Sequence, residues 1–302
     1  MLLLLMPAAA TSHVGVQHSH RKSGPSRELK RVHTNAPHVG VACSSEHFPV
    51  GTAGDMQIAK ERAQDAAHKV ISSRLTFLKK DVLQMHIDFL LEMETTGRSG
   101  MILECGVAKG GSAIVMAAAK RRKRCLHLFD TFSGMPPPST RDGEDVHRRY
   151  RVIKSGGAGR GYYGYMSDLL KFDQQMFRTL GYPPDKHNVI FHKGMFNETL
   201  HPAGRVAYAH VDGDWYDSVF SVLDAIETFM VHDGVIVLDD VVHYSGARKA
   251  YTDFFNTQLS AIPRSKSTAN VRNATTSCVT RRGTKFDLFF VHGRYGAIRR
   301  RE

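Results

Sequence analysis

Five short apolar runs alternate with longer stretches of helical pattern through the middle of the chain. The runs are Met101–Cys105, Leu126–Asp130, Asn188–His192, Val206–Asp212 and Val235–Asp240. This βαβ rhythm predicts an α/β fold, a doubly wound and mostly parallel sheet wrapped by helices. None of the runs approaches the roughly 18–20 residues that a membrane-spanning helix requires.

The two ends of this pattern add further elements. Apolar residues recur at three- and four-residue steps up to Glu94, which predicts an N-terminal helical extension over Met56–Glu94. Near the other end, Ser277–Thr280 and Phe286–Val291 are joined by the short link 281–284, which contains a glycine. We therefore expect seven strands, the last two forming an antiparallel hairpin.

Composition divides the chain into a domain with two tails. Residues 56–293 form the predicted domain, and its segment 133–165, with three prolines and seven glycines, is expected to be a lid. Residues 294–302 are expected to be a basic tail. Residues 1–55 are rich in His, Ser and Arg and are either an organellar targeting segment or a disordered tail. A cytoplasmic and an organellar location therefore both remain open.

The net charge of +12 raises the question of a nucleic-acid partner. Most of the excess lies at the ends: residues 264–302 carry ten Lys and Arg against two acidic residues. The central part of the chain is almost neutral, so nucleic acid is an unlikely main partner. The four cysteines form no C-x-x-C pair, which speaks against a structural zinc site.

A glycine-rich turn follows the first apolar run and precedes a small-residue helix. Gly106 permits a tight turn, Gly110 lets a ligand approach the backbone, and Ser112 offers a donor at the helix start. Glu104 suits a cationic group, and Asp130, 24 residues after Gly106, suits ribose hydroxyls. The spacing G-x-x-x-G-G fits a nicotinamide dinucleotide poorly, whereas S-adenosylmethionine matches this set of groups. The alternative is a tight connection with no ligand.

Carboxylates end two further runs. Asp212, Asp239 and Asp240 are expected to meet at one edge of the sheet, where a cation would relieve their repulsion, and all-oxygen ligands suit Mg²⁺. The alternative is that they cap the following helices, and this is the expectation for Asp214. His243 follows shortly after and is a candidate general base.

With both groups of residues in place, the chain resembles the macrocin O-methyltransferase family of S-adenosylmethionine-dependent enzymes, which methylate sugar hydroxyls on antibiotics. The matching stretches are Glu104–Met116 (ECGVAKGGSAIVM), Phe129–Pro136 (FDTFSGMP), Lys193–Leu200 (KGMFNETL), His210–Ser218 (HVDGDWYDS) and Leu238–Ala250 (LDDVVHYSGARKA). The match covers roughly residues 70–258. The glycine turn also resembles that of catechol O-methyltransferase, a magnesium enzyme of similar fold.

The resemblance implies a Rossmann-like class I methyltransferase fold and assigns roles to particular residues. The implied cofactor contacts are Glu104, Gly106, Ser112 and Asp130. The implied Mg²⁺ ligands are Asp212, Asp239 and Asp240, with Asp212 also a candidate base. The segment corresponding to the lid covers the substrate in this family, but Arg148–Tyr163 does not match the family pattern, so the acceptor is open.

We therefore expect a Mg²⁺-dependent O-methyltransferase that acts on a hydroxyl, such as that of a sugar on a glycosylated natural product or glycan, with Asp212 or His243 taking the proton. A small-molecule or glycan acceptor is the expected partner, and no membrane partner is expected. An RNA methyltransferase and a non-catalytic S-adenosylmethionine-binding protein are the alternatives. The sequence leaves the oligomeric state open, with a homo-oligomer among the choices.

Overall fold

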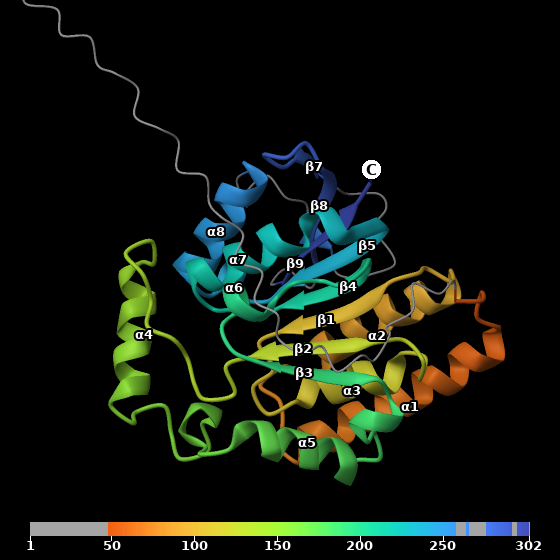
Figure 1. The fold of residues 1–302 in the computed structure, drawn as a ribbon. Coiled ribbons are helices and arrows are strands. Elements are labelled where there is room, and N and C mark those ends of the chain that lie inside the picture. Colours follow the sequence, from red (N-terminus) through yellow and green to blue (C-terminus); the bar gives the residue numbers. More distant parts are fainter. Residues whose placement is uncertain (1–47, 258–263, 266–275, 292–294, 302) are drawn as a thin grey trace, which may run out of the picture. The chain divides into compact units, whose positions relative to one another are not determined.

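The computed structural model describes residues 48–257, 264–265, 276–291 and 295–301. The expected targeting segment or tail at residues 1–55 lies outside the described residues up to residue 47, and its last three residues belong to a helix that begins at Ala53. Nine described strands form one mixed sheet in the order β3-β2-β1-β4-β5-β9-β8-β6, with β7 paired to β8 (Figure 1). Their bounds are β1 Met101–Cys105, β2 Leu126–Asp130, β3 Val189–Lys193, β4 Val206–Val211, β5 Met230–Leu238, β6 Arg264–Ser265, β7 Thr276–Val279, β8 Lys285–Val291 and β9 Tyr295–Arg300.

The five strands from β3 to β5 are mutually parallel, which confirms the doubly wound α/β class. The antiparallel pairing of β7 with β8 confirms the predicted hairpin. The expected number of seven strands was wrong, because β6 and β9 join the sheet as well. β6 pairs parallel to β8, and β9 runs antiparallel to both β5 and β8.

The prediction of a basic tail at 294–302 was wrong, since most of this segment is β9. Ala297 and Ile298 are fully buried between β5 and β8. The neighbouring Arg299 is also buried, and its Nη1 donates to Glu92 Oε1 at 2.6 Å. The basic residues made this segment look like a solvated tail, but Arg299 is buried and paired with Glu92, so the segment can form a strand.

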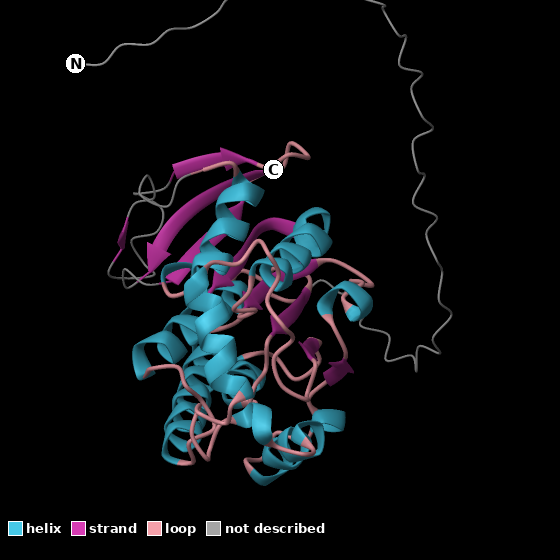
Figure 2. Cartoon of the chain, turned by 90° about the vertical axis from the view of Figure 1, so that its left-hand side faces the viewer, coloured by secondary structure: helices cyan, strands magenta, loops and turns pink. Residues whose placement is uncertain are grey.

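Helices cover both faces of the sheet (Figures 1 and 2). Their bounds are α1 Ala53–Ser72, α2 Lys80–Thr95, α3 Gly111–Ala119, α4 Glu144–Lys154, α5 Leu169–Thr179, α6 Phe196–Thr199, α7 Tyr216–Ile226 and α8 Ser245–Phe255. The single helix expected over 56–94 is two helices, α1 and α2, because the chain turns at Arg74, which has a φ of 54°. None of the described helices is both long and apolar enough to cross a membrane.

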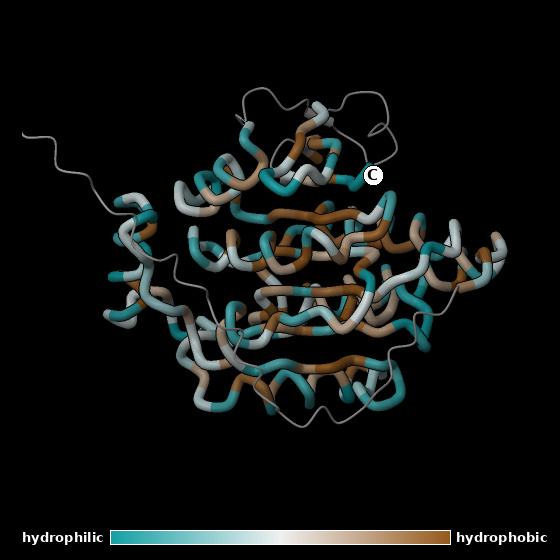
Figure 3. The backbone as a smooth tube through the Cα atoms, turned by 45° about the horizontal axis from the view of Figure 1, so that its top comes forward, coloured by the Kyte–Doolittle hydropathy of each residue, from teal (hydrophilic) through white to brown (hydrophobic). Residues whose placement is uncertain are grey.

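Two apolar cores lie on opposite faces of the sheet. One core packs α1, α2, α3 and part of α5 against the sheet, and the other packs α7 and α8. Figure 3 shows the resulting pattern, with apolar strand segments inside and polar connections outside. The strands read as near-continuous apolar runs because both of their faces are covered.

The helix α4 stands apart from these layers, beside the end of the sheet (Figure 1). It belongs to the segment 133–165, which the sequence predicts to be a lid. Asp145 in its first turn accepts hydrogen bonds from the backbone N–H of Ser245, at 2.9 Å, and from the Ser245 hydroxyl. These bonds dock the start of α4 on the start of α8.

Candidate active site

Strand register brings the glycine turn and the carboxylates together. β1 lies between β2 and β4, so the chain order reverses at this point, where ligands bind in open α/β sheets. Cys105 pairs with Val211, and the N–H of Asp212 donates to Cys105 O at 2.8 Å. Val211 in turn pairs with Leu238 of β5. The residues that follow β1, β4 and β5 therefore leave the sheet side by side.

Gly106 occupies the closest approach in this turn. Its φ is 96°, in the left-handed region, and a Cβ at this position would overlap the carbonyl oxygen of Asp212. Asp130, at the end of β2, fixes the turn: its Oδ2 accepts from Val107 N at 2.7 Å and from Ala108 N at 3.2 Å. Its Oδ1 accepts from Phe132 N at 2.8 Å. The turn is thus held by backbone hydrogen bonds and has no room for a side chain at Gly106.

The other predicted cofactor residues are placed differently. Ser112, in the first turn of α3, lines the cavity beside the turn, as do Gly106 and Asp130. Glu104 is fully buried, and its Oε1 lies 3.0 Å from His210 Nδ1. Gly110 precedes α3 with a φ of 75°. The structure therefore brings Gly106, Ser112 and Asp130 to the cavity, whereas Glu104 and Gly110 are not among the residues that line it.

The carboxylates after β4 and β5 do converge, but in a different combination from the predicted one. Oxygen atoms of Asp212, Asp214 and Asp240 lie within 4.8 Å of one another. Asp239 also lines the cavity, and its Oδ1 is buried with no hydrogen-bond partner in the structure. The exposed side chain of His243 does not belong to that lining, although the imidazole is close enough to favour the charged form of Asp239.

The expectation that Asp214 caps the following helix was wrong. The residue before α7 is Trp215, which makes no side-chain cap, and the N–H of Tyr216 donates instead to Asp142 Oδ1 at 2.8 Å. Asp214 itself has a φ of 56°, so its backbone turns the side chain into the acidic group rather than toward α7.

Burial and mutual repulsion strain this acidic group. Burial, together with Asp239 and Asp240, raises the pKa of Asp212 well above its ordinary value. Burial and the neighbouring Asp212 do the same to the pKa of Asp214. Burial and Asp214 raise the pKa of Asp240, whose Oδ2 is buried without a partner. A divalent cation among these oxygens would favour the ionised forms.

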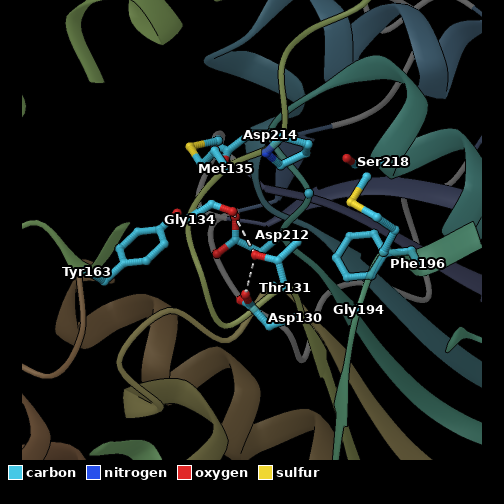
Figure 4. A pocket seen from close by; sticks show the side chains of 14 residues that line it. Asp130, Thr131, Gly134, Met135, Tyr163, Gly194, Phe196, Asp212, Asp214 and Ser218 are labelled. Carbon is cyan, nitrogen blue, oxygen red and sulfur yellow. Dashed lines mark hydrogen bonds between the residues drawn. The ribbon is translucent and has the colours of Figure 1, made fainter. Parts of the chain in front are cut away.

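Two connected hollows surround these residues. The first is shown in Figure 4, where Asp130, Asp212 and Asp214 lie between Tyr163 on one side and Phe196 on the other. The second shares Asp130 and Asp212 with the first and continues from the glycine turn to the carboxylates and the lid. The turn, the ribose-type acid and the acidic group therefore open into one continuous space.

The sequence argument missed several residues of this space. Its wall contains Thr131, Gly194, Met195 and Phe196 after β2 and β3, and Phe77, Arg149, Tyr163 and Tyr244 around the lid. The first four fall within or beside the stretches that match the resembled family, so a signal for them existed. Tyr244 also lies within a matching stretch, Leu238–Ala250, whereas Phe77, Arg149 and Tyr163 carried no such signal, because they come from separate elements that only the fold brings together.

Asp173 of α5 is a further missed residue. It is fully buried, and neither of its carboxyl oxygens has a hydrogen-bond partner among the described residues. A Cβ on Gly110 would lie 3.6 Å from the Asp173 carboxyl carbon, so this acid sits directly behind the glycine turn. Burial, assisted by Asp130 and Glu104, raises the pKa of Asp173 to about 9.

The residues present fit both groups that the resemblance implies. The backbone at Gly106 leaves a cradle that a Cβ would fill, and Asp130 stands at the end of the neighbouring strand, as binding of an adenosine with an amino-acid end requires. Oxygen ligands on one Mg²⁺ lie about 3 to 4 Å apart. The converging oxygens of Asp212, Asp214 and Asp240 suit such an ion. Burial and neighbouring carboxylates raise the pKa values of Asp212 and Asp214, and a bound cation would offset this effect.

Comparison with known proteins agrees with this site. The fold is that of the class I methyltransferases: the structure of the O-methyltransferase NovP matches with a TM-score of 0.56 and 18% identity, over 75% of this chain and 82% of that chain. The chain belongs to the macrocin O-methyltransferase (TylF) family, whose model matches residues 57–264.

Two curated relatives come from Streptomyces. The 8-demethyl-8-(2,3-dimethoxy-alpha-L-rhamnosyl)-tetracenomycin-C 4'-O-methyltransferase of Streptomyces olivaceus is 30% identical over 166 residues, 53% of this chain and 59% of the relative. The demethyldecarbamoylnovobiocin O-methyltransferase of Streptomyces niveus is 27% identical over 172 residues, 51% of this chain and 58% of the relative. The chain thus spans somewhat more than half the length of each.

Proposed function

We propose that this chain is a Mg²⁺-dependent O-methyltransferase that moves a methyl group from S-adenosylmethionine to a hydroxyl, that of a sugar on a glycosylated natural product or glycan. The observation that carries the proposal is the continuous space joining the glycine turn at Gly106, the acid Asp130 and the carboxylates after β4 and β5. Family membership and the names of the sugar-modifying relatives support the choice of acceptor.

The residues divide the chemistry between them. S-adenosylmethionine supplies an activated methyl sulfonium when bound, and Mg²⁺ supplies a Lewis acid that lowers the pKa of a hydroxyl. The backbone around Gly106, with Ser112 and Asp130, would hold the cofactor in the cavity that the carboxylates also line. Asp212, Asp214 and Asp240, whose oxygens converge, would hold the ion, and the neighbouring Asp239 would offer a further oxygen donor.

Proton removal falls to a residue beside the acceptor oxygen. Of the two predicted bases, Asp212 lines the cavity, whereas the side chain of His243 is exposed. Asp212 is therefore the better placed to take the proton. Tyr162 and Tyr163 of the lid line the same space and would limit the access of water to a bound acceptor.

The basic C-terminal part of the chain does not favour an RNA acceptor. Arg282 forms ion pairs with Asp224 and Glu227, at 2.7 and 3.1 Å. Arg301 pairs with Asp287. These arginines serve the fold, which leaves fewer of them for phosphate binding.

Calorimetric titration with S-adenosylhomocysteine, with and without Mg²⁺, tests the proposal. Micromolar binding is the expected result. Absence of binding in both conditions would overturn the methyltransferase assignment. The metal role is tested separately by Asp239→Ala, which we expect to abolish methyl transfer while changing S-adenosylhomocysteine affinity only a few-fold. Full activity of that variant in the presence of a chelator would contradict it.

A further inference from the structure

One arginine of the lid occupies a position where the helix pattern calls for an apolar residue. In α4, Val146 and Ile153 are buried and mark the inner face of the helix. Arg149 lies between them on that face, three residues after Val146 and four before Ile153, and it lines the cavity. The two other arginines nearby behave differently: Arg148 is exposed, and Arg151 is exposed and paired with Glu144.

The contacts of Arg149 are with uncharged groups. Its guanidinium lies 5.8 Å from the centre of the Tyr162 ring, and Tyr244 lines the same cavity. Among the described residues, no carboxylate lies within ion-pair distance of it, although Asp214 and Asp240 line the same cavity. A guanidinium has five N–H donors in a rigid fork. Most of these donors remain available to a molecule in the cavity.

The position of Arg149 is fixed by the rest of the lid rather than by its own contacts. Asp145, one helical turn earlier, anchors α4 to Ser245. The Tyr162 ring lies beside the guanidinium. The docked helix and this ring restrict the fork before a ligand arrives, which reduces the entropy lost when it binds a planar or tetrahedral anion with two hydrogen bonds.

We propose that Arg149 binds an anionic group of the acceptor, a carboxylate or a phosphate, while the acceptor hydroxyl lies beside Asp212 and Asp240. This inference rests on the proposed function, because it places the acceptor between the lid and the acidic group. Arg149 is half-buried and attracts Asp214 electrostatically, but the two form no ion pair, so a ligand anion in contact with the guanidinium would supply the close partner that it lacks. Arg149 is then a determinant of acceptor specificity.

The test compares three acceptor probes that share a glucose ring. Methyl β-D-glucoside is neutral, methyl β-D-glucuronide carries a carboxylate, and UDP-glucose carries a diphosphate. Each is titrated into the full chain saturated with S-adenosylhomocysteine and Mg²⁺. Binding is followed by the fluorescence of Trp215, the single tryptophan, whose ring lies 5.4 Å from that of Tyr244.

We expect at least one anionic probe to bind about tenfold or more tightly than the neutral glucoside. The probe that does so distinguishes a carboxylate from a phosphate. Arg149→Gln should remove this preference, Arg149→Lys should retain part of it, and Arg148→Gln is the matched control that should retain all of it. If neither anionic probe outperforms the glucoside, or if Arg149→Gln keeps the preference, the inference is wrong.

A role limited to balancing the carboxylates gives a different result. Arg149→Gln would then strengthen Mg²⁺ binding and leave the ratio of anionic to neutral affinities unchanged, which would also overturn the inference. Failure of the proposed function is separately visible, since wild-type protein would then not bind S-adenosylhomocysteine. Cofactor binding without an anionic preference contradicts only the role of Arg149.

Discussion

The glycine turn after β1 and the carboxylates after β4 and β5 are neighbours, yet their polar groups are satisfied to very different degrees. In the turn, both carboxyl oxygens of Asp130 accept backbone hydrogen bonds. In the acidic group, Asp239 and Asp240 each keep a buried oxygen without a partner. The turn held by Asp130, in the cofactor half of the site, is satisfied as the chain folds, whereas the acidic half is electrostatically incomplete until a cation joins it.

This difference shows that one cavity can prepare for its ligands in two ways, by fixed backbone geometry at the turn and by unrelieved charge repulsion at the carboxylates. A turn fixed by its own hydrogen bonds holds its shape without a ligand and selects by fit. A group of buried carboxylates stores unfavourable interactions that a ligand relieves, so binding there is driven by electrostatics. Four substitutions separate the two halves, and they follow in order of decreasing expected effect.

Gly106→Ala tests the rigidity of the cofactor half. The φ of 96° and the overlap of a Cβ with the Asp212 carbonyl predict a loss of about 4 kcal/mol in the free energy of unfolding. Urea denaturation measures it. The control is Gly161→Ala in the lid, where a Cβ meets nothing within 4 Å. Similar losses for both variants would show that the turn is not specially constrained.

Asp240→Asn tests the incomplete half. We expect Mg²⁺ affinity to fall by about 100-fold or more, because a charged ligand is lost. The metal-free variant should nevertheless melt at a higher temperature than metal-free wild type, because one buried repulsive charge is gone. Metal titration and calorimetric melting measure the two effects. A lower melting temperature together with unchanged Mg²⁺ affinity would show that the acidic half does not hold repulsive charge that a cation relieves.

Asp173→Asn tests an exception, a buried acid on the cofactor side. Its pKa is raised to about 9, so the folded state holds a proton that the unfolded state releases above about pH 4. Stability therefore falls as pH rises from about 4 toward 9. The variant should be more stable by about 2 kcal/mol at neutral pH and should show a flatter pH profile.

Thermal melting from pH 5 to 9 measures this effect. Asp168→Asn is the matched control on the same helix, because Asp168 is a cap whose oxygen accepts from Lys171 N at 3.1 Å. It should keep the wild-type pH profile. An identical slope in wild type and Asp173→Asn would show that Asp173 does not bind a proton on folding.

Asp130→Asn changes a satisfied acid and should have the smallest effect of the four. The amide keeps one acceptor oxygen for the turn and loses the charge, so we expect S-adenosylhomocysteine affinity to fall about tenfold. Mg²⁺ affinity should stay within twofold of wild type, since Asp130 is not part of the converging acidic group. A large loss of Mg²⁺ binding would mean that the halves are coupled.

The sequence predicted site residues correctly where a local motif lies at the end of a strand and the strand order brings such ends together. Gly106 and Asp130 were found because they follow apolar runs that become adjacent strands. Asp214 was assigned to a helix cap because its spacing suggests one, and no sequence pattern reveals that its φ is positive or that Asp142 from the lid takes the cap instead. The roles of Arg149 and Asp173 depend on which face of a helix meets the cavity or packs behind the glycine turn, and this is a tertiary property.

The placement of β9 has a consequence for synthesis on the ribosome. β5 forms its parallel pair with β4 early, but its other edge pairs with β9, which emerges more than 50 residues later. Until then the apolar edge of β5 is open to other chains. The strand β8 cannot join the sheet either, because β9 lies between β5 and β8. Nascent copies of this chain are therefore most exposed to mispairing late in translation, and chaperone demand should peak there.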